Sequence, residues 1–186
     1  MPIYANSNTV DDLILRFAYI FHPVSLGGGL PKLNLQRADG FSGEHPLKIG
    51  SVEIIPVPMM HGPLRACGWI LRDGAGNSIV YLTDCSEIPD SSVETIIQFG
   101  GNIAHAVIDG LRPDPHPTHC SYAQALAYAE RICPRHTWLT HINHDMAHAD
   151  IQRYIDRCLP RFPNLSRIVA EGGSAAPAYD GLVLNT

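Results

Sequence analysis

The sequence predicts an α/β protein with a mixed sheet, and two patterns carry that prediction. From Leu47 to His141, short β-rich runs alternate with segments of helical periodicity. The first of these runs are joined by DGAGN, a hairpin signal, whereas the later ones are separated by helices. An antiparallel hairpin followed by alternating strands and helices is the element order of a mixed sheet. The 186 residues, 45% of them apolar, suit one domain with a substantial core.

The N-terminal quarter of the chain has a different character. The segment from Thr9 to Tyr19 (TVDDLILRFAY) predicts a helix, with Thr9 as N-cap and acidic residues in the first turn. Residues 22–45 are rich in glycine and proline and predict a long irregular segment. The GGG run is not followed by GxxxxGK[ST], so we expect a flexible turn there rather than a phosphate loop. We therefore divide the single domain into a helix with an irregular excursion (1–46) and a β-rich, then α/β, part (47–186).

Five strands and three helices are predicted in the second part. The strands are expected over residues 52–59, 68–73, 78–84, 103–110 and 136–141. The helices are expected over residues 91–99, 122–132 and 149–159. The second of these helices has two candidate N-caps, Thr118 and Ser121.

Composition and charge exclude several classes of partner. The net charge is −5 and no Lys/Arg cluster occurs, so neither extended nucleic acid nor a membrane surface is an expected partner. No leader pattern and no apolar stretch of roughly 18 residues are present. The five cysteines are an odd number without a CxxC pair, which indicates reduced thiols. We therefore expect a cytoplasmic protein.

Polar residues at four predicted strand ends indicate a metal site. His61, Asp84, Asp109 and His141 each stand at the end of such a strand. In α/β sheets ligands collect at the carboxyl ends of strands, and imidazole and carboxylate groups are the usual ligands of divalent metals. A single histidine or aspartate at such a place is more often a loop hydrogen-bonding group or a helix cap. The set of four carries more weight than any one member.

Two further histidine-rich stretches flank these strand ends. His141, His144 and His148 have the spacing of one helix face, but no HExxH motif is present, and surface or outer-shell roles stay open for some of them. In HPTHCSY, His119 is either part of an N-capping turn or a proton donor or acceptor beside a metal. The cysteines Cys85 and Cys120 have no predicted activating base, so we interpret them as small packing residues.

These residues stand in an ordered series of motifs that resembles a known family. The series VPMMHG, IVYLTDCSEIP, VIDGLRPDPHPTHCSYAQAL and TWLTHINHDM resembles the C-terminal part of metallo-β-lactamase-fold hydrolases, in particular the PhnP-like phosphodiesterase branch. The resemblance runs from about Pro2 to the end of the chain. It implies an αββα sandwich, present here as the C-terminal half with a preceding helix and long loop.

The resemblance also implies roles for individual residues. His61 and His141 would each bind one of two divalent metal ions, and Asp84 would bridge the two. His119 would assist cleavage of the phosphodiester, together with the metals that Asp84 holds, and a metal-bridging hydroxide would be the nucleophile. Arg112, near His119, is a weaker candidate for a phosphate contact, because a lone exposed arginine is more often structural. The metals would be Zn²⁺ or Mn²⁺, with Fe²⁺ also compatible with such ligands.

The family motif HxHxDH is absent from the sequence, although its side chains supply most ligands of both metals in the family. We therefore expect that the chain is truncated, that it binds metal weakly and that alone it has impaired activity or none. We also expect one apolar face of its sheet to be left exposed. A genuine short protein that pairs with another chain is the less favoured explanation.

The expected function of the complete protein is hydrolysis of a small, cyclic or nucleotide-like phosphodiester. One alternative is another reaction of the same fold, on a thioester, a lactone or a tRNA 3′ end. Another is a non-enzymatic fragment or interaction module. A homodimer stays open as the oligomeric state.

Overall fold

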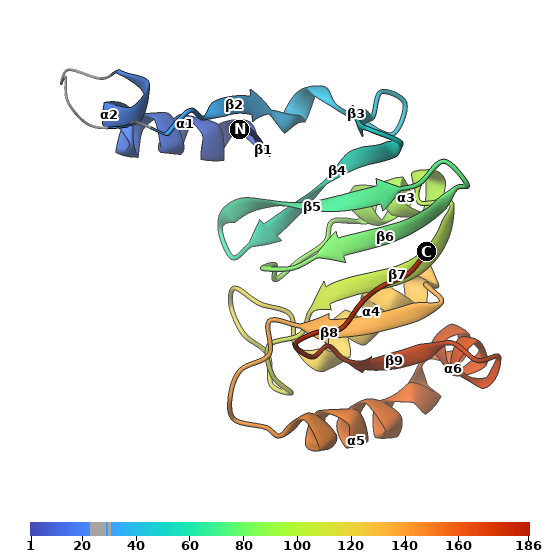
Figure 1. Cartoon of the computed structure of the whole chain (residues 1–186). Helices are drawn as coiled ribbons and strands as arrows, with labels where there is room; N and C mark the ends of the chain where they lie inside the picture. Colours follow the sequence, from blue (N-terminus) through green and yellow to red (C-terminus); the bar gives the residue numbers. More distant parts are fainter. Residues whose placement is uncertain (23–28, 30) are drawn as a thin grey trace.

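The computed structural model describes residues 1–22, 29 and 31–186. Its centre is a sheet in which seven described strands follow the order β3-β4-β5-β6-β7-β8-β9 (Figure 1). The strands are β3 (Leu47–Ile49), β4 (Val52–His61), β5 (Leu64–Arg72), β6 (Asn77–Leu82), β7 (Asn102–Asp109), β8 (His136–Thr140) and β9 (Ser174–Pro177).

The sheet is mixed, as the sequence predicts. Strands β3 to β6 pair antiparallel, and β6 to β9 pair parallel. The predicted hairpin at DGAGN joins β5 to β6, where Asp73 accepts hydrogen bonds from the backbone N–H of Ala75 and Asn77, both at 2.9 Å. All five predicted strands are present. The sequence reading did not separate out β3 or find β9, because three or four residues give too short a pattern.

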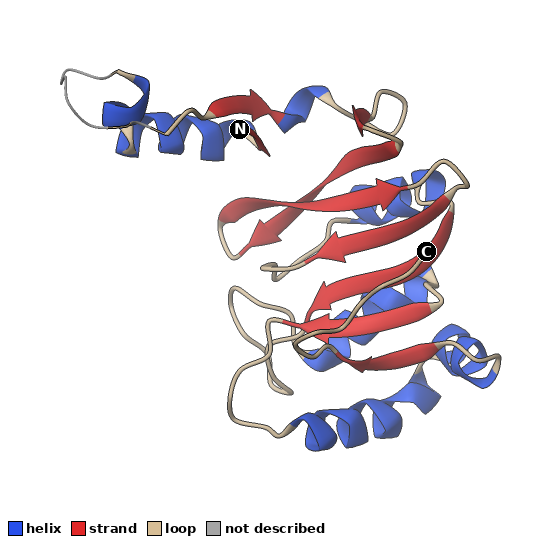
Figure 2. Cartoon of the chain, in the orientation of Figure 1, coloured by secondary structure: helices blue, strands red, loops and turns tan. Residues whose placement is uncertain are grey.

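Four helices follow the hairpin, and they cover one face of the sheet and its β9 end (Figure 2). These helices are α3 (Asp90–Phe99), α4 (Tyr122–Ile132), α5 (His148–Cys158) and α6 (Pro163–Ala170). The first three confirm the predicted helices, and α6 was not predicted. Apolar side chains fill the space between helices and sheet, and fully buried examples are Ile55, Leu82, Leu126, Leu139 and Ile155.

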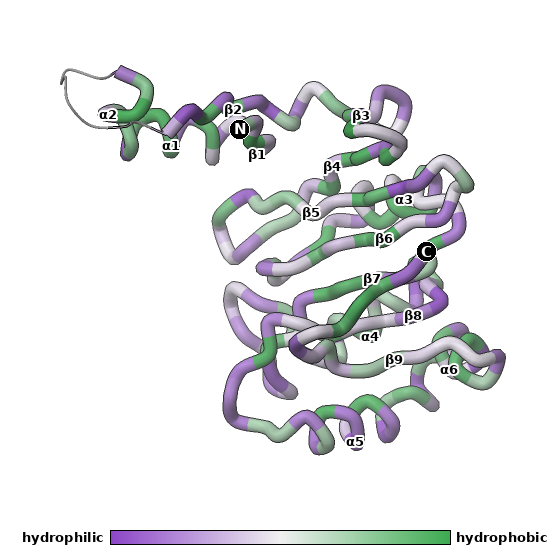
Figure 3. The backbone as a smooth tube through the Cα atoms, in the orientation of Figure 1, coloured by the Kyte–Doolittle hydropathy of each residue, from purple (hydrophilic) through white to green (hydrophobic). Residues whose placement is uncertain are grey.

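The opposite face of the sheet is less covered. Side chains alternate between the two faces along each strand. On this face lie the side chains of Trp69, Tyr81 and Trp138, and Tyr81 is 45% exposed. The C-terminal segment runs across part of this face, as Figure 3 shows, and the carbonyl of Asn185 hydrogen-bonds Nε2 of His105 at 2.9 Å. This face, which we expected to be left exposed, is exposed at Tyr81 and covered in part by the C-terminal segment.

The N-terminal part departs from prediction in two respects. The first helix, α1 (Ser7–Arg16), begins earlier than predicted, because Asn6 is the N-cap and accepts a hydrogen bond from the N–H of Thr9 at 2.9 Å. No acidic residue lies in its first turn, and the chain then bends into the short helix α2 (Ala18–Phe21).

The second departure concerns the stretch predicted to be irregular. It contains strand β2 (Asn34–Arg37), which pairs in parallel with β1 (Pro2–Ala5), and a 3₁₀ turn, Ala38–Gly40. Parallel pairing of two four-residue strands about thirty residues apart leaves no local signal in the sequence. Most of the glycine run lies outside the described residues. Within those residues, no helix reaches the length and apolarity that crossing a bilayer requires.

Helix α4 begins with a capping box that is directly testable. Ser121, not Thr118, is the N-cap: its Oγ accepts from the N–H of Gln124, whose side-chain oxygen accepts from the N–H of Ser121 at 2.8 Å. We expect Ser121→Ala to lower the free energy of unfolding by about 1 kcal/mol, measured by urea denaturation. The exposed Ser91 of α3 is the matched control, and Ser91→Ala should change the free energy of unfolding by less than about 0.5 kcal/mol. Equal losses for the two variants would contradict the capping role.

Candidate metal centre

Four strand ends meet at one edge of the sheet. His61 is the last residue of β4, Asp84 follows β6, Asp109 is the last residue of β7, and His141 follows β8. Strands β6, β7 and β8 are parallel neighbours, and β4 runs in the same direction as β6 because two antiparallel pairings separate them. Their carboxyl ends therefore lie at a common edge, as the sequence predicts.

Asp84 stands at the centre of three imidazole rings. Its Oδ1 lies 3.2 Å from Nε2 of His61, 3.7 Å from Nε2 of His141 and 3.8 Å from Nδ1 of His119. The ring of His119 is close to both of the other rings, with its centroid 4.9 Å from that of His61 and 4.5 Å from that of His141. The three residues predicted to bind metal and the predicted catalytic histidine are thus brought together.

The backbone at two of these positions is strained. Asp84 and His141 have φ angles of 61° and 60°, in the left-handed region that non-glycine residues seldom adopt. Such conformations persist only where surrounding contacts hold them, and they cluster at functional sites. At Asp84 the following turn is tied to β4, because the N–H of Ser86 donates to the carbonyl of Met60 at 2.7 Å. That bond also brings His61 toward Asp84.

Asp109 is the buried member of the cluster. Its side chain is fully buried, and its Oδ2 accepts hydrogen bonds from the N–H of Cys85 at 3.1 Å and from Nδ1 of His119 at 3.0 Å. Its Oδ1 is buried and has no hydrogen-bond partner among the described residues. The strand-end pattern counted Asp109 among the candidate metal ligands, but the family resemblance gave it no role, and nothing in the sequence shows which loops reach over it.

The donor set fits a divalent metal. Asp84, Asp109, His119 and His141 each offer a ligand atom, and these atoms lie within 4.8 Å of one another. Carboxylate oxygen and imidazole nitrogen are the ligands that Zn²⁺ and Mn²⁺ accept. The orphaned Oδ1 of Asp109 is a buried acceptor that a cation would satisfy. This set of four includes His119, the predicted proton donor, and it leaves out His61, one of the predicted ligands.

Two other predicted histidines lie apart from this cluster. The side chain of His144 is 99% exposed in a turn, and its nearest acidic partner is Asp145, at 3.7 Å. His148 begins α5 and contacts the carbonyl of Pro177 at 3.2 Å. The spacing of His141, His144 and His148 thus does not place them on one helix face, because the chain turns between them before α5 begins.

Arg112 and the neighbouring thiols have structural contacts. The guanidinium group of Arg112 donates to the backbone carbonyls of Asp114 and Pro115, so its own loop takes up part of its hydrogen-bonding capacity. Cys85 and Cys120 are fully buried, as the packing interpretation expects. The adjacent Cys120 thiol and burial raise the pKa of Cys85, which keeps that thiol protonated and unreactive.

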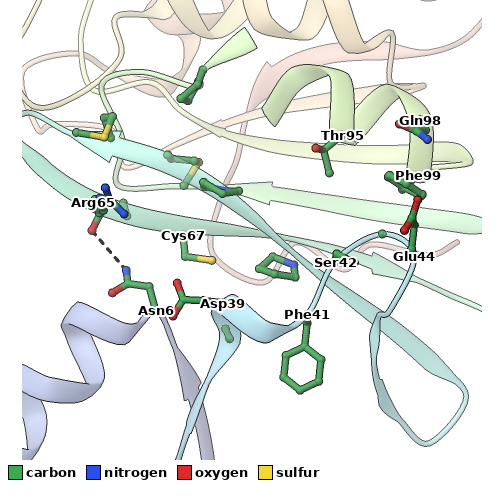
Figure 4. Close-up of a pocket in the computed structure, with 18 residues that line it drawn as sticks. Asn6, Asp39, Phe41, Ser42, Glu44, Arg65, Cys67, Thr95, Gln98 and Phe99 are labelled. Atoms are coloured by element: carbon green, nitrogen blue, oxygen red, sulfur yellow. Dashed lines mark hydrogen bonds between the residues drawn. The ribbon is translucent and has the colours of Figure 1, made fainter. Parts of the chain in front are cut away.

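Several cavities border β4 and β5, and two of them lie near the β4–β5 residues closest to the cluster. One of about 460 Å³ borders His61 and Asp84 and is also lined by Arg65 and Trp69. A second, of about 680 Å³, lies between the segment around Phe41, the two strands and α3 (Figure 4). The histidines of the cluster do not line this second cavity, so of these two the first is the one placed to serve the candidate centre.

Comparison with known proteins agrees with the geometry. Residues 1–142 match the family described as the Beta-lactamase superfamily domain. A diphosphatase from the PhnP family is 30% identical over 98% of this chain and 56% of its own, with a TM-score of 0.69. The metallo-β-lactamase-fold protein YhfI from Bacillus subtilis is 19% identical over 98% of this chain and 64% of its own, with a TM-score of 0.67.

A third structure extends the range of chemistry on this fold. An isothiocyanate hydrolase from Delia radicum gut bacteria is 13% identical and covers the whole of this chain and 67% of its own, with a TM-score of 0.61. A comparison with curated proteins finds no match. The chain spans less than two thirds of the length of the first two solved structures. By its matched residues, its mixed sheet and the ligand cluster at the strand ends, the chain belongs to the β-lactamase superfamily and has the metallo-β-lactamase fold.

Proposed function

We propose that the protein is a metal-dependent phosphodiesterase that acts on a small, cyclic or nucleotide-like phosphodiester. The observation that supports this proposal most is the arrangement of three imidazole rings around Asp84. One of these rings, that of His119, is hydrogen-bonded to the buried carboxylate of Asp109. Such a set combines metal ligands with a histidine that can transfer a proton near neutral pH.

The residues divide into two roles under this proposal. His61, Asp84 and His141 would hold divalent metal, which when bound lowers the pKa of water and neutralises charge on a phosphoryl group. His119 would donate a proton to the leaving oxygen. Its side chain is 12% exposed, so it is open to a substrate while largely shielded from water.

The cavity beside the cluster is consistent with a small substrate. At about 460 Å³ it lies in the size range of small-molecule sites. Trp69 offers an aromatic surface, and Arg65 is a cation that suits an anionic ligand. A nucleotide-like diester combines the aromatic and anionic groups that such a lining would recognise.

Diphosphate hydrolysis is a second candidate, because the 30% identical structure of the PhnP family is a diphosphatase. Both reactions transfer a phosphoryl group to water, so the same ligands and the same proton donor would serve. A direct comparison of kcat/KM for a cyclic nucleotide diester and for a nucleoside diphosphate ester would discriminate between them. We expect the diester to be preferred.

Replacement of Asp84 tests the metal role. We expect Asp84→Asn to reduce metal-dependent hydrolysis of bis(4-nitrophenyl) phosphate to the background rate, because the carboxylate at the centre of the imidazole rings loses its charge. The assay contains excess Mn²⁺ or Zn²⁺. Asp12, an exposed residue of α1, provides the control Asp12→Asn, which should retain the wild-type rate. Unchanged turnover in Asp84→Asn would contradict the assignment.

Replacement of His119 tests the proton-donor role. We expect His119→Ala to lower kcat by about 10²- to 10⁴-fold, the usual contribution of a positioned acid or base. Its metal content, measured by elemental analysis, should equal that of the wild type. His144→Ala removes an exposed histidine and should leave both quantities unchanged. If His119→Ala loses the metal, then His119 is a ligand and the proposed role is incorrect.

A further inference from the structure

We propose that His105 is a proton-sensitive latch: its uncharged ring holds the C-terminal segment, residues 182–186, on the less covered face of the sheet, and its protonation releases that segment. His105 belongs to β7, and the segment crosses the sheet there (Figure 3). The inference is independent of the proposed function, because it concerns the face of the sheet and not the cluster at the strand ends.

Both ring nitrogens of His105 have a hydrogen-bond partner. The indole N–H of Trp138 donates to Nδ1 at 3.1 Å, and Nε2 lies 2.9 Å from the backbone carbonyl oxygen of Asn185. An indole N–H is only a donor, and a carbonyl oxygen is only an acceptor. Nδ1 must therefore be unprotonated and Nε2 must carry the proton. The two partners together require a neutral ring in one defined tautomer.

The surroundings of His105 disfavour a positive charge. The residue is 7% exposed, and the ring of His136 on the neighbouring strand β8 stacks on it with the two centroids 5.1 Å apart. Burial lowers the pKa of His136, and the nearby His105 and Arg135 lower it further. A charge on His105 would meet the same repulsion. It would also convert Nδ1 into a donor and so remove the acceptor of the Trp138 N–H.

The remaining neighbours of His105 do not offset such a charge. On β6 the residue in register with it is the apolar Ile79, and Tyr81 follows on the same face. The acidic groups beside the C-terminal segment are Asp73, which accepts from the hydroxyl of Thr186 at 3.2 Å, and the carboxylate of Thr186 itself. Among the described residues, the ion-pair contacts between a histidine and a carboxylate are made by other histidines.

A ring that must be neutral in the docked arrangement makes that arrangement depend on pH. Once the C-terminal segment leaves, water reaches the ring of His105, which can then take up a proton and turn away from Trp138. Acid therefore favours the released state, because only that state accommodates the charged ring. The docked state is complete above the range in which histidine titrates, and it is lost as the pH falls through that range, from about 7 to about 5.

The first test is an NMR titration of the wild-type chain. The sequence has two tryptophans, so two indole N–H signals are expected, and the one that vanishes in Trp138→Phe belongs to Trp138. Between pH 8 and pH 5 we expect this indole proton to shift upfield as it loses its acceptor. Over the same range the ¹H–¹⁵N NOEs of Val183 and Asn185 should fall, because the released segment gains motion on the ps–ns timescale.

The core residue Leu126 is the internal reference, and its NOE should stay that of a rigid backbone at both pH values. A C-terminal segment that stays ordered at pH 5 would overturn the proposal. So would an indole signal of Trp138 that does not change with pH.

The second test is His105→Gln, which supplies one acceptor and donors but no group that titrates. We expect the C-terminal segment of this variant to stay ordered from pH 8 to pH 5. His144→Gln removes an exposed histidine and is the matched control, which should keep the pH dependence of the wild type. Release at pH 5 that persists in His105→Gln would contradict the latch. The first test needs no variant of His105, so it decides even if the glutamine does not reach both partners.

Discussion

The contact between the buried carboxylate of Asp109 and His119 is the constraint on which the candidate centre depends. Parallel pairing of β6, β7 and β8 brings three strand ends to one edge, but it does not orient the loops that leave them. Oδ2 of Asp109 joins two of those loops, through the N–H of Cys85 and Nδ1 of His119. Because the carboxylate is shielded from water, these two bonds are stronger than equivalent bonds at the surface.

The rest of the molecule supports this contact. The capping box at Ser121 fixes the start of α4 two residues after His119, and the carbonyl of Cys85 accepts from the N–H of Cys120 at 2.8 Å. Both loops are therefore held against each other by backbone bonds as well as by Asp109. The backbone strain at Asp84 and His141 agrees with this: the surrounding contacts, rather than the intrinsic backbone preferences of the two residues, hold the loops at the strand ends in place.

The sequence predicted the elements whose patterns are long enough to read. The strands and helices from residue 52 to residue 158 were found because alternation and helical period extend over several residues in each. Short elements were missed: β1, β2 and β9 have four residues each, and β1 pairs with β2 although α1 and α2 stand between them in the chain. The N-cap of α1 was misplaced because Asn6 and Thr9 are both good capping residues.

The part of the candidate site that stands at strand ends could be predicted from the sequence. His61, Asp84 and His141 follow from the strand pattern together with the family resemblance, and the structure brings them together. The burial of Asp109 and its contact with His119 could not be predicted, since they depend on how two loops fold over the end of β7. A surface role had been left open for His144, and its side chain is exposed; the spacing of one helix face does not apply to it, because the helix begins only at His148.

The most direct test of the account is the stoichiometry of Zn²⁺ binding to the purified chain, measured by competition with a chromogenic chelator. The account predicts at least one Zn²⁺ bound per wild-type chain, and loss of that ion when Asp84 is replaced by asparagine, since Asp84 lies within 4 Å of three imidazole nitrogens. A wild-type chain that stays free of metal at saturating Zn²⁺, or a variant that binds Zn²⁺ as well as the wild type, would contradict it.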